Sequence, residues 1–267
     1  MDKAKESHLN YERVIFNNSA LELCIVQLKY PPIQRFSDEK YMIGIKEALA
    51  DEYPLESTEQ GMNIVITPQG VSQTPGASML RFTSIDSSWS VVLSNETVSL
   101  ETREYSHIDE FSTRFASILD SVATHLRPRH QLRIGLRFIN EFRFPDGDRY
   151  ETWRRLLNAD LIGLGFGSVL GGEIEQTIAE ILTRRDDGRL LVRHGFLKGS
   201  TISSTPTRPA KTGPFYLLDL DYSDETPTKF EVDAPIERMK RYNKFLYDVF
   251  RWSIGDGELY QRLKGEL

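Results

Sequence analysis

Residues 79–105 read MLRFTSIDSSWSVVLSNETVSLETREY, and this stretch decides the fold. Apolar residues alternate with polar residues in three short runs, separated by polar turn-forming clusters at residues 86–88 and 94–96. The apolar members of the runs are Leu80 and Phe82, then Trp89, Val91 and Leu93, then Val98 and Leu100. Alternation at a period of two is typical of half-buried strands. The stretch therefore predicts three antiparallel strands that follow one another in a meander.

A helix is predicted directly after the meander. Ser106 and Asp109 form an acidic variant of the capping box, and Pro128 ends the helix. The apolar residues between them recur at spacings of three and four: Ile108, Phe111, Phe115, Ile118, Leu119, Val122 and Leu126. Such a stripe covers one side of a helix. We expect it to pack on the apolar face of the sheet.

A further strand is predicted for residues 132–144. Successive side chains of a strand point to opposite faces. One side therefore carries Ile134, Leu136, Phe138, Phe142 and Phe144, and the other carries Arg133, Arg137, Glu141 and Arg143. If this strand and the meander share a sheet, the second face of that sheet carries Glu101, Arg103, Tyr105, Arg133, Arg137 and Glu141.

The sequence of this region resembles that of an uncharacterised, sporadically distributed family of bacterial proteins of about this length. The matching motifs are Leu80–Ser84, Trp89, Leu100–Tyr105, Phe111, Arg114–Phe115 and Arg133–Asn140, with the sequences LETREY and RIGLRFIN at their centre. Where the family often has GLRYIN, this chain has Phe138 in place of the tyrosine. Tyr30-Pro31-Pro32 and a phenylalanine-containing helix near the end match more loosely. The resemblance implies one recurrent kind of domain and no particular chemistry.

The remaining patterns predict a second set of strands and helices. Strands are expected at residues 21–28, 62–67, 174–184, 189–197 and 215–222, with residues 229–233 pairing with the last of these. Helices are expected after the caps Ser37, Asp148 and Asp233, with a short tail helix at residues 258–263. Residues 68–78 and 199–213 are rich in Gly, Pro, Ser and Thr, which predicts loops. Asp187-Gly188 is a favoured hairpin turn.

The predicted fold class is therefore α+β: an antiparallel β-sheet with long helices packed on one face. We expect an N-terminal lobe at residues 1–158, a glycine-rich connector at residues 159–172 and a C-terminal lobe at residues 173–267. The alternatives are one continuous domain and two lobes related by duplication. The GxGxG at residues 163–167 is not a dinucleotide fingerprint, because no clear strand precedes it and no helical stripe follows at once.

Composition and charge narrow the class of protein. The 267 residues are 39% hydrophobic and 27% charged, which is ordinary for a globular protein. No apolar run approaches the roughly 18 residues of a membrane span, and the polar start has no signal-peptide core. Cys24, the single cysteine, lies in an apolar run, which favours a buried thiol over a disulfide or a thiolate metal site. We expect a cytoplasmic location and no membrane association.

The predicted ligand- or partner-binding residues are Glu101, Arg103, Tyr105, Arg133, Arg137 and Asn140. Arginines on a strand surface can bind a phosphate or a carboxylate through two parallel hydrogen bonds. The alternative is a ladder of ion pairs on a solvated face, in which each pair contributes a few tenths of a kcal/mol. The family motifs coincide with these residues, so both interpretations stay open.

No catalytic, cofactor or metal motif stands out. Asp219 and Asp221 share a strand face, and Glu231 lies on the expected neighbouring strand, so a Mg²⁺ or Mn²⁺ site is a weaker alternative. No lysine follows at nuclease spacing. His194 alternates with Val192 and Phe196, which places it on an apolar face. We therefore expect no cofactor and no metal.

The leading functional hypothesis is a cytoplasmic protein-interaction or accessory module with a protein partner. The sporadic distribution of the resembling family suggests an antitoxin-like partner in a mobile bacterial gene cassette. A homodimer is a further expectation, and the net charge of −6 argues against broad nucleic-acid binding. The alternatives are a phosphoester- or nucleotide-processing enzyme that uses the arginine face or Asp219 and Asp221, and a sensor in which Arg103, Arg133 and Arg137 bind a small anion.

Overall fold

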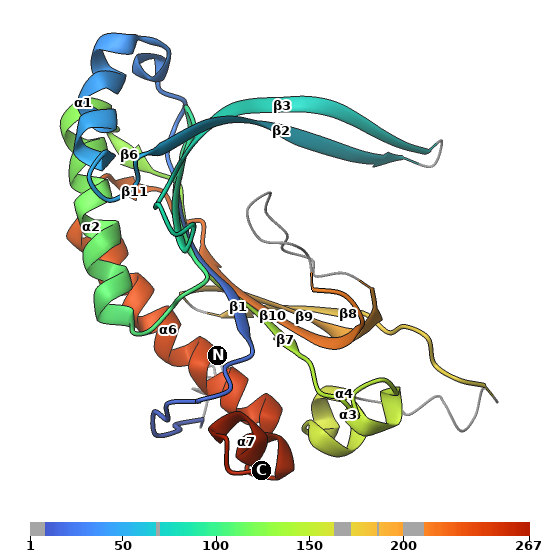
Figure 1. Cartoon of the computed structure of the whole chain (residues 1–267). Coiled ribbons are helices and arrows are strands. Elements are labelled where there is room, and N and C mark those ends of the chain that lie inside the picture. Colours follow the sequence, from blue (N-terminus) through green and yellow to red (C-terminus); the bar gives the residue numbers. More distant parts are fainter. Residues whose placement is uncertain (1–8, 68–69, 163–171, 186, 200–210) are drawn as a thin grey trace, which may run out of the picture. The chain divides into compact units, whose positions relative to one another are not determined.

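The computed structural model describes residues 9–67, 70–162, 172–185, 187–199 and 211–267 (Figure 1). Nine strands form an antiparallel sheet with the order β2-β3-β4-β5-β1-β7-β10-β9-β8, and β11 pairs with β6 in a separate ribbon. Together with the helices, this confirms the α+β class. In the described part of the chain, no helix has the length and apolar character needed to span a membrane.

The strands are β1 Leu21–Lys29, β2 Leu55–Thr67, β3 Gly70–Thr83, β4 Trp89–Leu93, β5 Thr97–Thr102, β6 His130–Gln131, β7 Arg133–Phe142, β8 Ala179–Arg185, β9 Gly188–Lys198, β10 Pro214–Asp224 and β11 Thr228–Lys229. The helices are α1 Glu39–Leu49, α2 Ile108–His125, α3 Tyr150–Leu156, α4 Ala159–Ile162, α6 Asp233–Ile254 and α7 Glu258–Lys264, with a 3-10 turn at Gln34–Ser37.

The chain divides into two compact units that are interleaved in sequence. Unit 1 comprises Met1–Cys24, Arg137–Ser223 and Arg241–Leu267, and unit 2 comprises Ile25–Leu136 and Asp224–Lys240. This partition differs from the predicted boundaries at residues 158 and 172, because β1 and β7 each begin in one unit and end in the other. Residues 163–171 of the predicted connector lie outside the described residues, and a duplication stays a prediction.

In unit 2, the predicted meander is present as β3, β4 and β5. Phe82 pairs with Val91, and Val91 pairs with Leu100, which aligns the apolar residues on one face. Helix α2 packs on that face: its Phe111 ring centroid lies 5.9 Å from that of Trp89. All seven residues of the predicted apolar stripe are buried. Figure 1 shows α1 (blue) beside α2 (green).

Two predicted helix caps in unit 2 are wrong by one residue. His107 is the N-cap of α2, and its ring Nδ1 accepts a hydrogen bond from the Asp109 N–H at 3.2 Å. Ser106 instead donates to the Glu110 carboxylate at 2.7 Å. Asp38 caps α1 in place of Ser37, because its carboxylate accepts from the Lys40 N–H.

The predicted loop at residues 68–78 is also wrong over most of its length. Strand β3 begins at Gly70 and pairs with β2, which itself extends back to Leu55. Pro75 lies inside this strand, so the composition of the segment is like that of a loop. Pro75 is paired with Met62, next to a register shift after Gln60. Irregular positions of this kind are where a strand accepts a proline.

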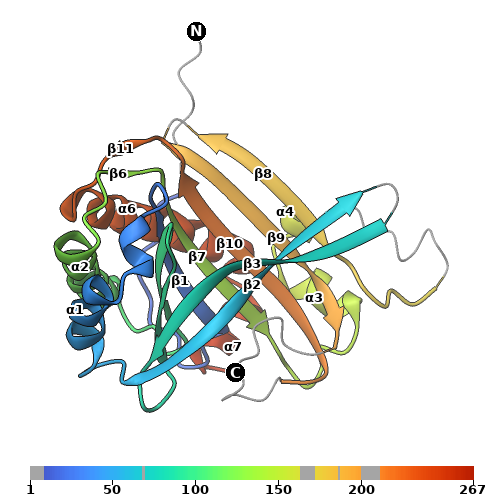
Figure 2. The ribbon, with the colours of Figure 1, turned by 90° about the horizontal axis from the view of Figure 1, so that it is seen from above.

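In unit 1, the predicted hairpin is present as β8 and β9, and β10 pairs antiparallel with β9 (Figure 2). Gly188 at the turn has φ of +155°, a conformation that favours glycine. Residues 229–233 do not pair with β10. Thr228 and Lys229 pair with β6, the Phe230 N–H donates to the Arg129 carbonyl, and α6 begins at Asp233.

The apolar core of unit 1 lies between the strands and the second half of α6. Tyr242 packs on Tyr222 with ring centroids 4.6 Å apart, and Phe250 stacks on Phe142 at 6.2 Å. Cys24 is fully buried, as predicted, and burial raises the pKa of its thiol. Asp148 does not cap α3, because that helix begins at Tyr150 and its N-cap position is Arg149.

Candidate functional site

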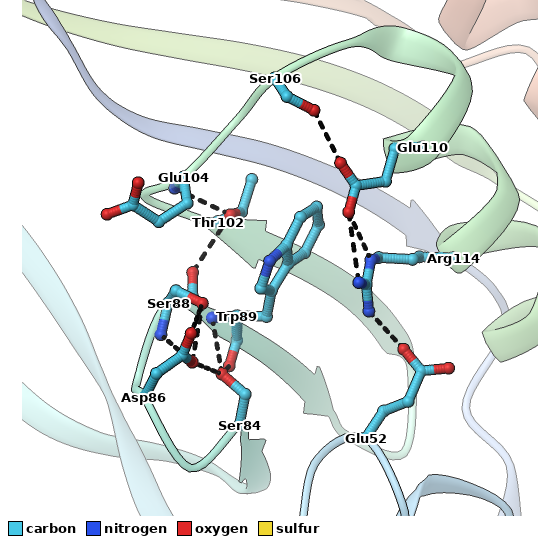
Figure 3. A network of polar contacts seen from close by, with 10 residues as sticks. All are labelled: Glu52, Ser84, Asp86, Ser88, Trp89, Thr102, Glu104, Ser106, Glu110 and Arg114. Atoms are coloured by element: carbon cyan, nitrogen blue, oxygen red, sulfur yellow. Dashed lines mark hydrogen bonds and ion pairs between the residues drawn. The ribbon is translucent and has the colours of Figure 1, made fainter.

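Unit 2 contains an open pocket of about 980 Å³. It lies between the β3–β4 turn, the first half of α2 and the segment after α1 (Figure 3). The lining residues are Glu52, Ser84, Ile85, Asp86, Ser88, Trp89, Asp109, Glu110, Thr113 and Arg114. Four of these carry a carboxylate, and one carries a guanidinium.

Arg114 and Trp89 form the inner wall of the pocket. The guanidinium carbon of Arg114 lies 4.5 Å from the centroid of the Trp89 ring, which is a cation–π contact. The same guanidinium donates two hydrogen bonds of 3.2 Å to Glu110, one helical turn earlier, and forms an ion pair with Glu52. Two carboxylates therefore already balance the charge of Arg114.

The β3–β4 turn holds a third carboxylate, that of Asp86, on the other side of the Trp89 ring from Arg114 (Figure 3). It accepts hydrogen bonds from the Ser84 hydroxyl at 2.6 Å, the Ser88 hydroxyl at 2.7 Å and the Ser88 N–H at 3.0 Å. These bonds, the one from Ser84 first, lower the pKa of Asp86 to about 2. The serine partners are neutral, so the carboxylate keeps its full negative charge at neutral pH.

Hydrogen bonds to the residues at the end of β5 also hold the β3–β4 turn in place. The Thr102 hydroxyl donates to the Ser88 carbonyl at 3.1 Å and accepts from the Glu104 N–H at 3.0 Å. The Arg103 N–H donates to the same Ser88 carbonyl. Because the turn is tied to the end of β5, the position of Asp86 relative to Trp89 is set by the sheet.

The rim of the pocket is exposed and combines apolar and acidic side chains. Ile85, in the turn, is 74% exposed. Asp109, in the first turn of α2, has an exposed side chain that lies 3.0 Å from the His107 ring. A hydrogen bond from Ser106 and the nearby Arg114 lower the pKa of Glu110. With four carboxylates against one guanidinium, the lining has a formal charge of −3 at neutral pH and suits a cationic group attached to an apolar one.

The predicted site residues of unit 2 have other partners. Glu101 accepts a hydrogen bond from Arg81 at 2.8 Å, and Arg81 also donates to Glu59 at 2.7 Å. Arg133 donates to the Gln27 side chain at 3.3 Å. The Tyr105 ring packs against Phe111 of α2, so it lies on the helix side. The backbone of Arg103 supports the Asp86 turn.

The predicted site residues of unit 1 are held in a different way. Arg137 donates two hydrogen bonds of 2.7 Å to Asp219, from Nε to one carboxylate oxygen and from a terminal nitrogen to the other. A terminal nitrogen of Arg193 lies 3.6 Å from the same carboxylate. The Asn140 side chain is buried and donates to the Leu218 carbonyl at 3.1 Å. Arg137 and Asn140 therefore join β7 to β10, Arg137 through an ion pair and Asn140 through a hydrogen bond to the backbone.

The weaker metal alternative gains no support from these positions. Asp219 is bonded to Arg137, and Asp221 lies two residues further along β10 in unit 1, whereas Glu231 belongs to unit 2. The described residues contain no group of three or more His, Cys, Asp or Glu side chains that could hold a metal ion.

Sequence reasoning did not select the pocket residues as a site. Glu110 and Arg114 stand four residues apart on a predicted helix, a spacing that predicts an ion pair. The sequence around Asp86 indicates only a turn. Glu52 precedes Arg114 by 62 residues, and no local signal relates the two.

The comparison of the sequence with family models finds no match, and the comparison with curated proteins finds none either. The family resemblance therefore remains a prediction that rests on the motifs around LETREY and RIGLRFIN.

Proposed function

We propose that this protein is a protein-interaction module whose pocket around Trp89 binds a basic segment of a partner protein. The observation that supports the proposal is the charge balance of the pocket. Arg114 is neutralised by Glu52 and Glu110, and Asp86 is held ionised by neutral serine groups. A lysine or arginine of the partner would pair with Asp86 and Asp109, and an adjacent apolar side chain would cover Ile85.

The same geometry gives less support to the alternatives. A small anion would be repelled by the lining carboxylates, and on unit 1 it would have to displace Asp219 from Arg137. Hydrolysis through a covalent intermediate needs a nucleophile activated by an adjacent base, and the low pKa of Asp86 makes its carboxylate a weak base. Within the described lining, the serine hydroxyls bond to Asp86, and neither histidine nor cysteine is present. Binding of a basic segment needs no catalytic group and fits an antitoxin-like accessory role in the cytoplasm.

The test is a fluorescence anisotropy titration with a labelled peptide of alternating lysine and leucine, at about 50 mM salt. Exposed ion pairs contribute about 0.2–1 kcal/mol each, so Asp86→Asn and Asp109→Asn should each weaken binding roughly one-and-a-half- to fivefold. The loss should shrink at high salt, because surface charges are screened.

The control variant is Asp120→Asn, which removes an exposed carboxylate from the same helix outside the pocket. It should bind as tightly as the wild-type protein, and a peptide with glutamate in place of lysine should not bind. Equal binding of the glutamate peptide, or an equal loss in Asp120→Asn, would show that the pocket does not recognise a basic segment.

A further inference from the structure

Strand β8 is the last strand of the sheet order and one of the most exposed strands of unit 1. One side of its backbone pairs with β9, and within the described residues no strand covers the other side. Ile181 and Leu182 point to opposite faces, yet they are 48% and 63% exposed. An open edge with apolar side chains is a template for another strand.

The hydrogen bonds to β9 determine which backbone groups face the open edge. The Thr177 N–H donates to the Phe196 carbonyl at 2.8 Å, in the same register as the pairing of Ala179 with His194. Bonded and non-bonded pairs alternate in an antiparallel ladder. Odd-numbered residues of β8 therefore bond to β9, and the backbone groups of Glu180, Leu182 and Arg184 face the open edge.

A row of alternating charges crosses the strands and ends at this edge. Arg137 on β7 pairs with Asp219 on β10, and Arg193 on β9 lies 3.6 Å from Asp219. Arg193 then donates to Glu180 on β8 at 2.6 Å. The row ends with the carboxylate of Glu180, which is half exposed. A positive charge beyond it would continue the alternation.

The same strand supplies such a charge. Arg184 lies directly opposite Arg189 on β9, and like charges at opposed positions destabilise a sheet. Its backbone groups face the open edge, like those of Glu180. The edge therefore presents one acid and one base at four-residue spacing, with Leu182 midway between them.

We propose that the chain forms a symmetric dimer in which β8 pairs antiparallel with β8 of a second copy, centred on Leu182. In this register Glu180 faces Arg184 of the second copy, and two-fold symmetry makes the contact twice. The two Leu182 side chains meet, and about six backbone hydrogen bonds form. Each Arg184 then faces a carboxylate on one side, which offsets its apposition to Arg189.

The side-chain pairs select this register among its neighbours. Moving the centre to residue 181 places Leu182 opposite Glu180, and moving it to residue 183 places Leu182 opposite Arg184. Moving it to residue 180 or 184 opposes two acids or two bases, which is unfavourable. The dimer surface uses residues of unit 1, whereas the proposed partner pocket is lined by residues of unit 2.

The first test is disulfide cross-linking of Leu182→Cys under mild oxidation. Directly opposed Cα atoms lie about 5.5 Å apart in a bonded antiparallel pair, which is within the range for a disulfide. The native Cys24 is buried and does not compete. The matched control is Ile178→Cys, also exposed, because residue 178 lies far from its own copy in this register. Cross-linking at 182 well above that at 178 is expected, and equal rates would overturn the proposal.

The second test is sedimentation equilibrium of Arg184→Glu. This change removes the apposition of Arg184 to Arg189 within the chain, so the melting temperature of the diluted monomer should stay the same or rise. In the dimer it opposes two carboxylates twice, so the dissociation constant should rise at least tenfold. The control for net charge is Arg154→Glu on the exposed side of α3, which should dimerise as the wild-type protein does. A wild-type chain that stays monomeric at all concentrations, or an unchanged constant in Arg184→Glu, would refute the dimer.

Discussion

At the scale of single residues, His194 shows how a local pattern determines an environment. Its alternation with Val192 and Phe196 predicted an apolar face, and the side chain is buried. Its Nδ1 lies 2.8 Å from the Tyr216 hydroxyl. Burial lowers the pKa of His194 and raises that of Tyr216, because both charged forms lose their hydration. The sequence indicated the face, but the tyrosine partner is on another strand and could not be identified.

This environment predicts a pH-dependent stability. The unfolded histidine has its ordinary pKa of about 6.5, and the folded one resists protonation. The contribution of His194 to stability is therefore complete above about pH 6.5 and decreases as the pH falls towards the lower folded pKa. His194→Gln should flatten the dependence of the free energy of unfolding between about pH 7 and 5, measured by urea denaturation. Carboxylates whose pKa is lowered act below this range.

The exposed His130 provides the control for this experiment, because His130→Gln changes a histidine without changing the core. It should retain the wild-type slope. If both variants lose stability with the same slope as the wild-type protein, His194 does not cause the dependence.

At the scale of elements, the sequence predicted which segments are helices and strands better than where they begin. The stripe of α2 and the alternation of β4 and β5 depend on many residues, so the prediction tolerates a local error. Caps depend on one side chain, and neighbours such as Ser106 and His107 compete for the same donors. The first part of β3, residues 70–78, was predicted as a loop because it contains glycines and a proline, although pairing with β2 holds it in a strand.

The β8–β9 turn provides a prediction at this scale. A Cβ atom at Gly188 would lie 2.6 Å from the Ser223 carbonyl, and the φ of +155° is strained for other residues. Gly188→Ala should therefore lower the free energy of unfolding by about 1–3 kcal/mol in urea denaturation. Gly172→Ala is the control, because an added Cβ there meets no atom within 4 Å. Equal stability of the two variants would contradict the strain at Gly188.

At the scale of the whole molecule, the sequence predicted the fold class but not the partition into units. Local patterns act over a few residues, whereas unit 1 is assembled from three separate segments. For the same reason, the pairing of Glu52 with Arg114 and that of Arg137 with Asp219 needed the folded chain. Most charged residues of the predicted face lie in strands, as predicted, but Arg103 does not, because β5 ends at Thr102. The partners of these residues lie up to 106 positions away, as for Arg133 and Gln27.

The interleaved partition predicts the behaviour of fragments. A fragment of residues 1–158 contains most of unit 2 but lacks β8, β9, β10 and all of α6. It leaves Phe142 without Phe250 and Arg137 without Asp219. We expect it to show neither the far-ultraviolet circular dichroism nor the cooperative thermal unfolding of the intact chain. A fragment that unfolds cooperatively by itself would instead support the sequence-ordered lobes.

The buried thiol of Cys24 provides a natural probe of local unfolding in the intact chain. It is the last residue of the first segment of unit 1, on the strand that continues into unit 2 at Ile25. A thiol reagent can modify it only during moments when β1 is exposed, so the labelling rate measures how often that strand opens. Because the chain has one cysteine, this rate is read from the natural sequence without substitution. The rate at which β1 opens can thus be followed through a single sulfur atom.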